Sequence, residues 1–462
     1  MGAKGRPLYA TFLASTAALG GFLFGFDSAV INGAVSGIQR SFHSSSAGTG
    51  FAVASILLGC AVGALAAGRL ADRFGRRPVM VATAVIFAAT AAASALASGA
   101  AVFTLARFVS GIGVGAASVV CPAYIAEISP AAIRGRLASL QQLGIVVGIF
   151  VALLSDDRVA RAAGGVSAPF WGGLEAWRWM FMVEVLPSVV FGAAVIAVPE
   201  SPRFLVASGR DAEAQRVLDR VDPGLPASEI DAIRRTVQTE RAPRLADLRR
   251  EGGRGILPVV WIGVGLSVFQ QAVGINSIFY YGAVLWESVG FTSQDSLAIN
   301  VFTGVVNIVS TLVAMSLIDK VGRRPLLLAG SAGMALTLGI LAFALSFATV
   351  APGGAVQLPP RQAMTALVAA NAYVFAFGVS WGPCVWVLLG EMFPNRIRGA
   401  AMAVAVFAQW IANWLVTVSF PPIVDRLGPI AAYATYATAA ALSLVFVWRW
   451  VKETRGTTLE EA

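Results

Sequence analysis

Three ionisable residues lie inside long apolar stretches of the sequence, where a charge is costly. Asp27 interrupts the first stretch, Arg107 opens the fourth and Glu184 lies in the sixth. A charge at the centre of a membrane span costs about 2.5–3.5 kcal/mol on insertion scales, so such residues indicate a functional site. A nearby cation favours the ionised acid and desolvation favours the neutral one, so a moving arginine would switch the carboxylate. We interpret Asp27 as a proton-binding group partnered by Arg107; a static ion pair is the alternative, and Glu184 either joins the network or braces it.

Carboxamide and aromatic side chains gather in the second half of the chain. A carboxamide both donates and accepts hydrogen bonds, as a sugar hydroxyl does, and an aromatic face covers the apolar side of a pyranose. These residue types predict a site for a polyhydroxylated solute. Its candidate members are Phe24, Gln142, Gln270, Gln271, Asn276, Tyr280, Asn307, Trp386, Gln409 and Asn413. The alternative is that some of these amides only hold helices together, which is common in membranes.

The spacing of two candidates predicts a broken helix. Gln271 and Asn276 are five residues apart, which is about 140° around an ideal helix. They converge only if the helix is interrupted, and Gly274 between them permits that. Gly382–Pro383 predicts a second interruption just before Trp386.

The elements that position these residues are membrane-spanning helices. Hydrophobic residues make up 57% of the chain and charged residues only 13%, whereas a soluble domain carries about 25% charged residues. A span needs roughly 20 apolar residues to cross about 30 Å of hydrocarbon. We therefore expect an all-α membrane protein with twelve spans near 9–31, 48–70, 78–99, 101–123, 138–154, 178–198, 257–285, 297–318, 325–348, 362–389, 399–420 and 428–450.

The distribution of charge indicates the orientation. An even number of spans puts both termini on one side, and Lys4, Arg6 and the basic loop 69–77 predict that this side is cytoplasmic. The net charge of +9 then reflects short basic loops, and no nucleic-acid partner is expected. Residues 199–256 alternate charged and apolar residues at helical spacing, which predicts short amphipathic cytoplasmic helices; a solvated linker is the alternative.

The sequence also contains an internal repeat. Residues 72–77 (Asp-Arg-Phe-Gly-Arg-Arg) follow the second span, and residues 319–324 (Asp-Lys-Val-Gly-Arg-Arg) follow the eighth. Residues 127–135 and 391–399 likewise keep Glu, Pro, Arg and Gly at equal spacing. A duplicated unit of six spans explains both matches. We expect an N-terminal half at 1–198, a linker at 199–256, a C-terminal half at 257–450 and a cytoplasmic tail at 451–462.

In these loops the chain resembles the sugar porter family of the major facilitator superfamily, over essentially its whole length. The motifs that carry the resemblance are 68–77, 199–203, Gln270–Gln271 with Gly274–Asn276, and 453–456. One departure is Lys452, where a proline usually precedes the glutamate. The resemblance implies the major facilitator fold: twelve helices in two pseudo-symmetric halves, with a substrate site between them.

The resemblance also implies roles for single residues. Asp27 and Arg107 match the proton-coupling pair of bacterial xylose:proton symporters, and Gln142, Gln270, Gln271, Asn276, Asn307, Trp386 and Gln409 match positions that line the sugar site. It favours a cytoplasmic gate whose ion pairs latch the halves when the site faces outward and break when it faces inward. The gate residues are Arg69, Asp72, Arg76, Arg77, Glu127, Arg134, Glu200, Asp319, Arg323, Arg324, Glu391, Arg398 and Glu453, with Glu127 expected near Arg134 and Glu391 near Arg398. The alternative is that these charges only set the topology.

These expectations favour a proton-coupled symporter that imports a monosaccharide, with a hexose such as glucose ahead of xylose. A facilitative sugar uniporter and an inositol:proton symporter are the alternatives. Ser380–Pro383 resembles the symporter pattern, and Gly378 stands where animal facilitators tend to carry glutamate.

Two other classes of protein are disfavoured. A membrane enzyme would need a nucleophile, metal cluster or acid–base pair, and no histidine pair, Cys–His set or phosphate loop is evident; a sugar sensor would need a long signalling tail, whereas the tail here ends at Ala462. We expect no cofactor, no metal and no disulfide among Cys60, Cys121 and Cys384. A monomer surrounded by lipids in a bacterial inner membrane is expected.

Overall fold

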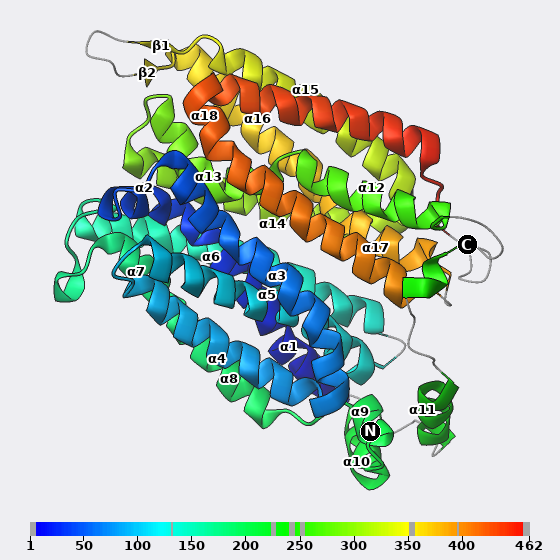
Figure 1. Cartoon of the computed structure of the whole chain (residues 1–462). Coiled ribbons are helices and arrows are strands. Elements are labelled where there is room, and N and C mark those ends of the chain that lie inside the picture. Colours follow the sequence, from blue (N-terminus) through cyan, green and yellow to red (C-terminus); the bar gives the residue numbers. More distant parts are fainter. Residues whose placement is uncertain are drawn as a thin grey trace.

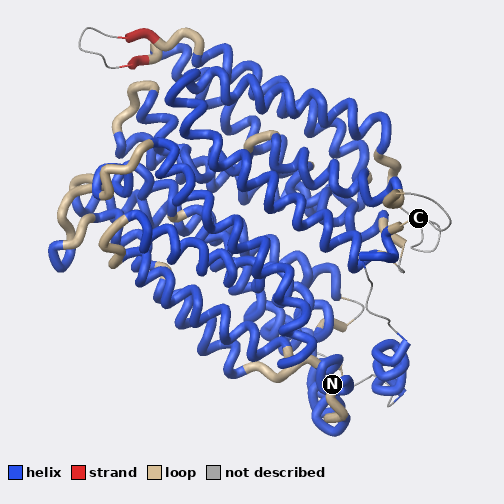
Figure 2. The backbone as a smooth tube through the Cα atoms, viewed as in Figure 1, coloured by secondary structure: helices blue, strands red, loops and turns tan. Residues whose placement is uncertain are grey.

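Helices make up almost all of the computed structural model (Figure 2), which describes residues 6–130, 133–222, 228–239, 245–249, 255–350, 356–394 and 397–455. Lys4 and residues 456–462 of the expected tail lie outside the described residues. The α-helices of the first half and linker are α1 (Arg6–Ala29), α2 (Ile31–Ser41), α3 (Ser46–Phe74), α4 (Arg76–Ala95), α5 (Ala100–Ile128), α6 (Arg134–Ala163), α7 (Ala176–Val183), α8 (Val185–Ala197), α9 (Pro202–Ala207), α10 (Asp211–Val221) and α11 (Ser228–Thr239). Those of the second half are α12 (Pro258–Ala272), α13 (Ile275–Ser288), α14 (Ser293–Val321), α15 (Arg323–Leu345), α16 (Pro360–Val379), α17 (Trp381–Met392) and α18 (Arg398–Trp450). The other described elements are two short 3-10 helices, Trp171–Gly173 and Leu245–Leu248, and a pair of antiparallel strands of two residues each, β1 (Thr349–Val350) and β2 (Val356–Gln357).

Eleven helical stretches within the described residues are long and apolar enough to cross a membrane, and some of them contain a break. One of them, α18, has 53 residues and would be about 80 Å long as a straight helix, far more than the roughly 30 Å of a bilayer core. Its backbone leaves the helical region at Gly428 (φ 81°, ψ 164°), and Figure 1 shows its orange and red parts as two adjacent rods. The two expected spans 399–420 and 428–450 are therefore both present, which gives twelve passes.

Two of the long apolar stretches are interrupted partway along their length, as the sequence predicted. Gly274 separates α12 from α13 in the left-handed conformation (φ 83°), and a Cβ there would lie 2.3 Å from the ring of Tyr436. The second interruption falls at Ser380 rather than at Gly382–Pro383. Pro383 lacks the N–H that would bond to the carbonyl of residue 379, so the break appears upstream of the proline itself.

Other span boundaries were predicted too short. The first pass continues beyond Ile31 through α2 to Ser41, because residues of low hydropathy there are buried by neighbouring helices. The fifth pass was expected at 138–154 but runs from Arg134 to Ala163, where Gly164 ends it with φ 83°. The expected span ended at 154, before the two acids Asp156 and Asp157, whereas both side chains are buried within the helix.

The helices pack mainly within their own halves. In the first half α3 packs on α5 and α1 on α6, and in the second half α15 packs on α16 and α18. A Cβ at Gly25 of α1 would lie 2.0 Å from the carbonyl oxygen of Ile145, so the α1–α6 contact requires glycine there. Contacts between halves pair α3 with α18, α6 with α14 and α2 with α13.

The polar segment between the halves forms α9, α10 and α11, on the same side of the bundle as the start of α1 and the end of α18 (Figure 1). We name this the terminal side, and the side that carries the β1–β2 hairpin the opposite side. On α10 the residues Ala214, Val217, Leu218 and Val221 are buried, so this helix is amphipathic, as its sequence predicts.

Candidate functional site

The centre of the first half contains a fully buried ion pair. Asp27 on α1 and Arg107 on α5 are each 1% exposed. Arg107 donates to one carboxylate oxygen of Asp27 and, over 2.9 Å, to its backbone carbonyl, while the Ser110 hydroxyl donates to the other carboxylate oxygen. The Arg107 guanidinium also lies 5.6 Å from the centre of the Phe181 ring. Each carboxylate oxygen of Asp27 thus has a donor, as a buried charge requires.

A second acid lies beside this pair without a hydrogen bond of its own. Glu184, at the junction of α7 and α8, is 1% exposed and neither of its carboxylate oxygens has a hydrogen-bond partner among the described residues. It interacts electrostatically with both Asp27 and Arg107. Pro187 lacks the N–H that would reach the carbonyl of residue 183, and this interruption places Glu184 at the helix junction. The structure therefore brings the three predicted ionisable residues together.

The second half contains a continuous chain of hydrogen-bonded amides. Gln270 donates over 2.9 Å to the carbonyl of Trp381, which lies at the break between α16 and α17. It also accepts from Gln409 over 2.8 Å. Asn276 donates to Gln271 over 2.7 Å across the Gly274 break. The predicted convergence of Gln271 and Asn276 is therefore confirmed, with Gly274 as its cause.

Tyr280 connects the amide cluster to the ionic centre. It is buried on α13, where it faces the side chains of Asn413 and Ser28, and it also interacts electrostatically with Arg107. Phe24 of α1 meets Trp410 of α18 with ring centres 6.0 Å apart, which is a second contact across the halves.

The remaining candidates are dispersed around this region. Asn413 accepts from Thr417 over 3.1 Å, and Asn307 is buried on α14. Gln142 is half-buried on α6, while Trp386 on α17 is 37% exposed. No hydrogen bond joins these last three side chains to the amide chain among the described residues.

Sequence reasoning missed several polar residues of this interior. Ser110 lies three residues after Arg107, on the same helical face, and that spacing was an available signal. The indole N–H groups of Trp410 and Trp414 and both amide atoms of Gln141 are buried without a hydrogen-bond partner in the described part of the chain. Trp410 and Trp414 follow Gln409 and Asn413 directly, whereas nothing in the sequence distinguished Gln141 from Gln142.

On the opposite side of the bundle, an asparagine joins the two halves. Asn32 of α2 donates to the carbonyls of Phe279 (3.0 Å) and Ile278 (3.3 Å), and it accepts from the Ala283 N–H and from Asn300. These four bonds tie the first half to the second. They were not predicted, because the expected first span ended before Asn32.

On the terminal side, each half has the same arrangement of charges. In the first half Arg76 pairs with Asp72 (3.1 Å) and Glu127 (3.0 Å), and Glu200 accepts from the backbone N–H groups of Arg76 and Arg77. The Arg77 guanidinium donates to the carbonyl of Ile196.

The second half repeats these contacts. Arg323 pairs with Asp319 (3.1 Å) and Glu391 (2.8 Å), and Glu453 accepts from the backbone N–H groups of Arg323 and Arg324. Partial burial would raise the pKa of Glu453, but the backbone N–H donors of Arg455, Arg323, Arg324 and Thr454 outweigh it and lower that pKa. The Arg324 guanidinium donates to the carbonyl of Trp448.

Two of the predicted gate pairs, Glu127 with Arg134 and Glu391 with Arg398, are not formed in this structure. Arg134 donates to the carbonyl of Ser129 and Arg398 to that of Phe393, whereas Glu127 and Glu391 bind Arg76 and Arg323. Each arginine starts a helix, α6 or α18, directly after a turn, so its guanidinium reaches back to the turn carbonyl. Arg69 is exposed at the end of α3.

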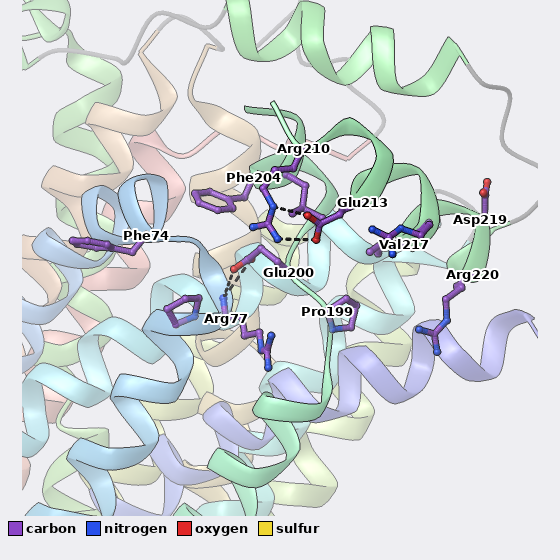
Figure 3. A pocket seen from close by; sticks show the side chains of 13 residues that line it. Phe74, Arg77, Pro199, Glu200, Phe204, Arg210, Glu213, Val217, Asp219 and Arg220 are labelled. Atoms are coloured by element: carbon purple, nitrogen blue, oxygen red, sulfur yellow. Dashed lines mark hydrogen bonds and ion pairs between the residues drawn. The ribbon is translucent and has the colours of Figure 1, made fainter. Parts of the chain in front are cut away.

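A cavity of about 650 Å³ lies on the terminal side, where α4 and the segment before α9 meet α10 (Figure 3). Its charged walls largely neutralise one another: Arg210 pairs with Glu213 over 2.7 Å, and Glu200 accepts from the Arg77 backbone. The cavity lies apart from both the ionic centre and the amide cluster, so we do not include it in the candidate site.

This geometry defines a membrane transporter with a charged centre in one half and an uncharged hydrogen-bonding cluster in the other. The model of the family "Sugar (and other) transporter" matches residues 13–462. The chain is 53% identical to the glucose transport protein of Synechocystis sp., over 98% of this chain and 97% of that protein, and 37% identical to the D-xylose-proton symporter of Escherichia coli, over 96% and 93%. It matches the partially occluded inward open structure of the Escherichia coli xylose transporter XylE with a TM-score of 0.84 and 34% identity, over 98% of this chain and 100% of that chain.

The chain belongs to the sugar (and other) transporter family. The prediction of a major facilitator fold is therefore confirmed, and the protein is a multi-pass membrane transporter rather than an enzyme.

Proposed function

We propose that the protein is a proton-coupled symporter that imports a monosaccharide, a hexose such as glucose in preference to xylose. The observation that carries the proposal is the division of one interior between a buried Asp27–Arg107 pair and a hydrogen-bonded amide cluster, with Tyr280 between them. The names of the relatives, a glucose transport protein and a D-xylose-proton symporter, support the same substrate classes.

The proton would bind to Asp27. While Arg107 and Ser110 donate to it, the carboxylate is stable as an anion; if Arg107 moves away, the buried charge loses its compensation and takes up a proton. Glu184 interacts electrostatically with both Asp27 and Arg107, so it would respond when the charge on Asp27 changes. Because sugar hydroxyls are neutral donors and acceptors, they would bind Gln142, Gln270, Gln271, Asn276, Asn307, Gln409 and Asn413 in place of the bonds these amides make to one another, with Phe24, Tyr280 and Trp386 contacting the ring.

Alternating access would rock the two halves, 1–198 and 257–450, about this interior. In the observed state Asn32 closes the opposite side, and the ion pairs of Arg76 and Arg323 each join residues of a single half. This supports an inward-facing state, in which the gate between the halves is released. We further propose that the terminal side faces the cytoplasm of a bacterium, that 199–256 is a cytoplasmic linker and 451–462 a tail, and that the protein is a monomer in the inner membrane.

A facilitative uniporter is the second candidate. It is favoured by the complete hydrogen bonding of Asp27, which is also what a permanent structural brace would show. The two functions differ in whether a proton gradient can drive accumulation.

The test is uptake of radiolabelled glucose by proteoliposomes, with and without an inward proton gradient. Xylose, galactose and inositol serve as competitors. Symport predicts accumulation above the external concentration only with the gradient. Equilibration at the same rate in both conditions would establish the uniporter, and competition by inositol alone would overturn the monosaccharide assignment.

A further inference from the structure

Besides Asp27 and Glu184, another buried acid has no paired cation among the described residues. Asp156, seven residues before the end of α6, is 0% exposed. One of its carboxylate oxygens accepts the Gly33 N–H over 3.2 Å, and the other has no hydrogen-bond partner among the described residues. A carboxylate buried in this way is costly, and such groups take up a proton instead.

The position of Asp156 connects it to the contact that closes the opposite side. Gly33 is the third residue of α2, and its neighbour Asn32 makes the four bonds to α13 and α14 described above. A Cβ at Gly33 would lie 2.7 Å from Asp156, so the backbone of α2 packs directly against this side chain. The state of Asp156 therefore bears on the segment that joins the two halves.

The charged groups on the central and opposite-side parts of the elements around Asp156 are engaged elsewhere. They are Asp157 with Arg161 on α6 itself, Arg40 of α2 with the Ser36 carbonyl, Asp27 of α1 with Arg107 of α5, Arg178 of α7 with the carbonyls of Ala95 and Ala97, Glu184 beside Arg107, and Asp295 of α14 with Thr292. Arg158 on the same helix is exposed. The Gly33 N–H is thus the one described donor to the Asp156 carboxyl, which is less than an anion needs when it is buried.

We propose that Asp156 is a second proton-binding site, and that its protonation holds the opposite side closed. The neutral carboxyl group fits the close contact between α6 and α2, where Asp156 is 0% exposed and a Cβ at Gly33 would lie 2.7 Å from it. When α2 separates from α6, water reaches Asp156, the O–H bond breaks, the proton passes to water and the carboxylate remains. Closure then requires that a proton be taken up again from the opposite side. The proposal rests on the alternating access proposed above, but not on proton coupling through Asp27.

The test measures opening directly. Spin labels at Leu96→Cys and Phe347→Cys, two exposed positions at the opposite-side ends of α4 and α15, report the distance between the halves by pulsed electron paramagnetic resonance as pH is varied. We expect the population with the longer distance to rise with pH in the wild-type background. Asp156→Asn, which keeps an acceptor for Gly33 and cannot ionise, should lose this pH step. Asp157→Asn, the adjacent acid, is the matched control and should keep it.

Two further results separate this proposal from the proposed symport. Asp27→Asn should keep the pH step in the distance even if it loses gradient-driven uptake. In Asp27→Asn/Glu184→Gln, an infrared band of a protonated carboxyl should remain and should vanish over the pH range in which the distance lengthens. An unchanged pH step in Asp156→Asn, or the absence of that infrared band, would overturn the proposal.

Discussion

The two halves of the transporter share a frame but differ in chemistry. At the terminal side the contacts correspond: Glu200 accepts from the backbone N–H groups of Arg76 and Arg77, and Glu453 from those of Arg323 and Arg324. Arg77 and Arg324 each donate to a carbonyl near the end of a helix. In the interior the first half holds a buried ion pair, whereas the second holds amides that bond to one another. The duplicated loops therefore keep the two six-helix units alike where they enter the membrane, and the functional difference lies at its centre.

This difference separates two kinds of ligand. A buried carboxylate responds to a proton because its charge changes, and its stability depends on a fixed partner. A carboxamide never changes its charge, so it can exchange one neutral hydrogen-bond partner for another at small net cost. The comparison predicts that substitutions in the first half affect stability and coupling, and that those in the second half affect sugar affinity.

The largest effect is expected for Arg107→Ala. Removing one member of a buried ion pair leaves the other charge uncompensated and costs about 3–5 kcal/mol. Thermal unfolding in detergent should show a strongly lowered midpoint. The double variant Asp27→Asn/Arg107→Ala removes both charges and should recover much of the loss, whereas Arg216→Ala on the exposed face of α10 should change nothing. Equal destabilisation by the single and double variants would contradict the pairing.

A smaller and different effect is expected for Gln270→Ala. It removes the acceptor for Gln409 and the donor to the Trp381 carbonyl, and the loss of a hydrogen bond to a ligand with its supporting contacts amounts to about 1.4 kcal/mol, or about tenfold weaker sugar binding. Sugar-dependent quenching of tryptophan fluorescence would measure it. Asn371→Ala removes another buried amide, which accepts from Thr303 outside the cluster, and should leave sugar affinity unchanged.

The smallest effect is expected at the terminal side. Because the pKa of Glu453 is lower in the folded state, its stabilising contribution is present above the unfolded value of about 4.3 and is lost as the pH falls through the folded value. The unfolding midpoint of Glu453→Gln should lie below that of the wild type at neutral pH and approach it below about pH 4. Glu200→Gln, the matched change in the first half, should lower the neutral-pH midpoint to a similar extent. A Glu453→Gln difference that persists unchanged in acid would contradict this assignment.

Much of this molecule could be predicted from the sequence. The twelve passes follow from apolar runs, and the repeat of 72–77 at 319–324 indicates two equivalent halves. The convergence of Gln271 and Asn276 follows from Gly274, because five residues place side chains on one face only across a break. The pairing of Asp27 with Arg107 follows from the cost of isolated charges in a membrane.

The rest depends on tertiary contacts that a linear pattern does not contain. Asn32 and Asp156 lie outside the apolar runs, so hydropathy placed them in loops, whereas packing against other helices keeps both inside helices. In this structure Arg134 and Arg398, which are near in sequence, each donate to a backbone carbonyl, whereas Arg76 and Arg323 reach the carboxylates of Glu127 and Glu391. The helix is interrupted at Ser380 rather than at Pro383 itself, because the N–H that Pro383 lacks would have bonded to a carbonyl four residues earlier.

The central claim is that Asp27 couples a proton to the sugar that the amide cluster binds. The most direct measurement compares wild type and Asp27→Asn in proteoliposomes, by gradient-driven accumulation and by counterflow exchange of the same labelled sugar. We predict that Asp27→Asn loses accumulation and retains exchange, because the neutral amide mimics the permanently protonated acid. Accumulation by Asp27→Asn at the wild-type level would contradict the claim and reduce the Asp27–Arg107 pair to a structural brace.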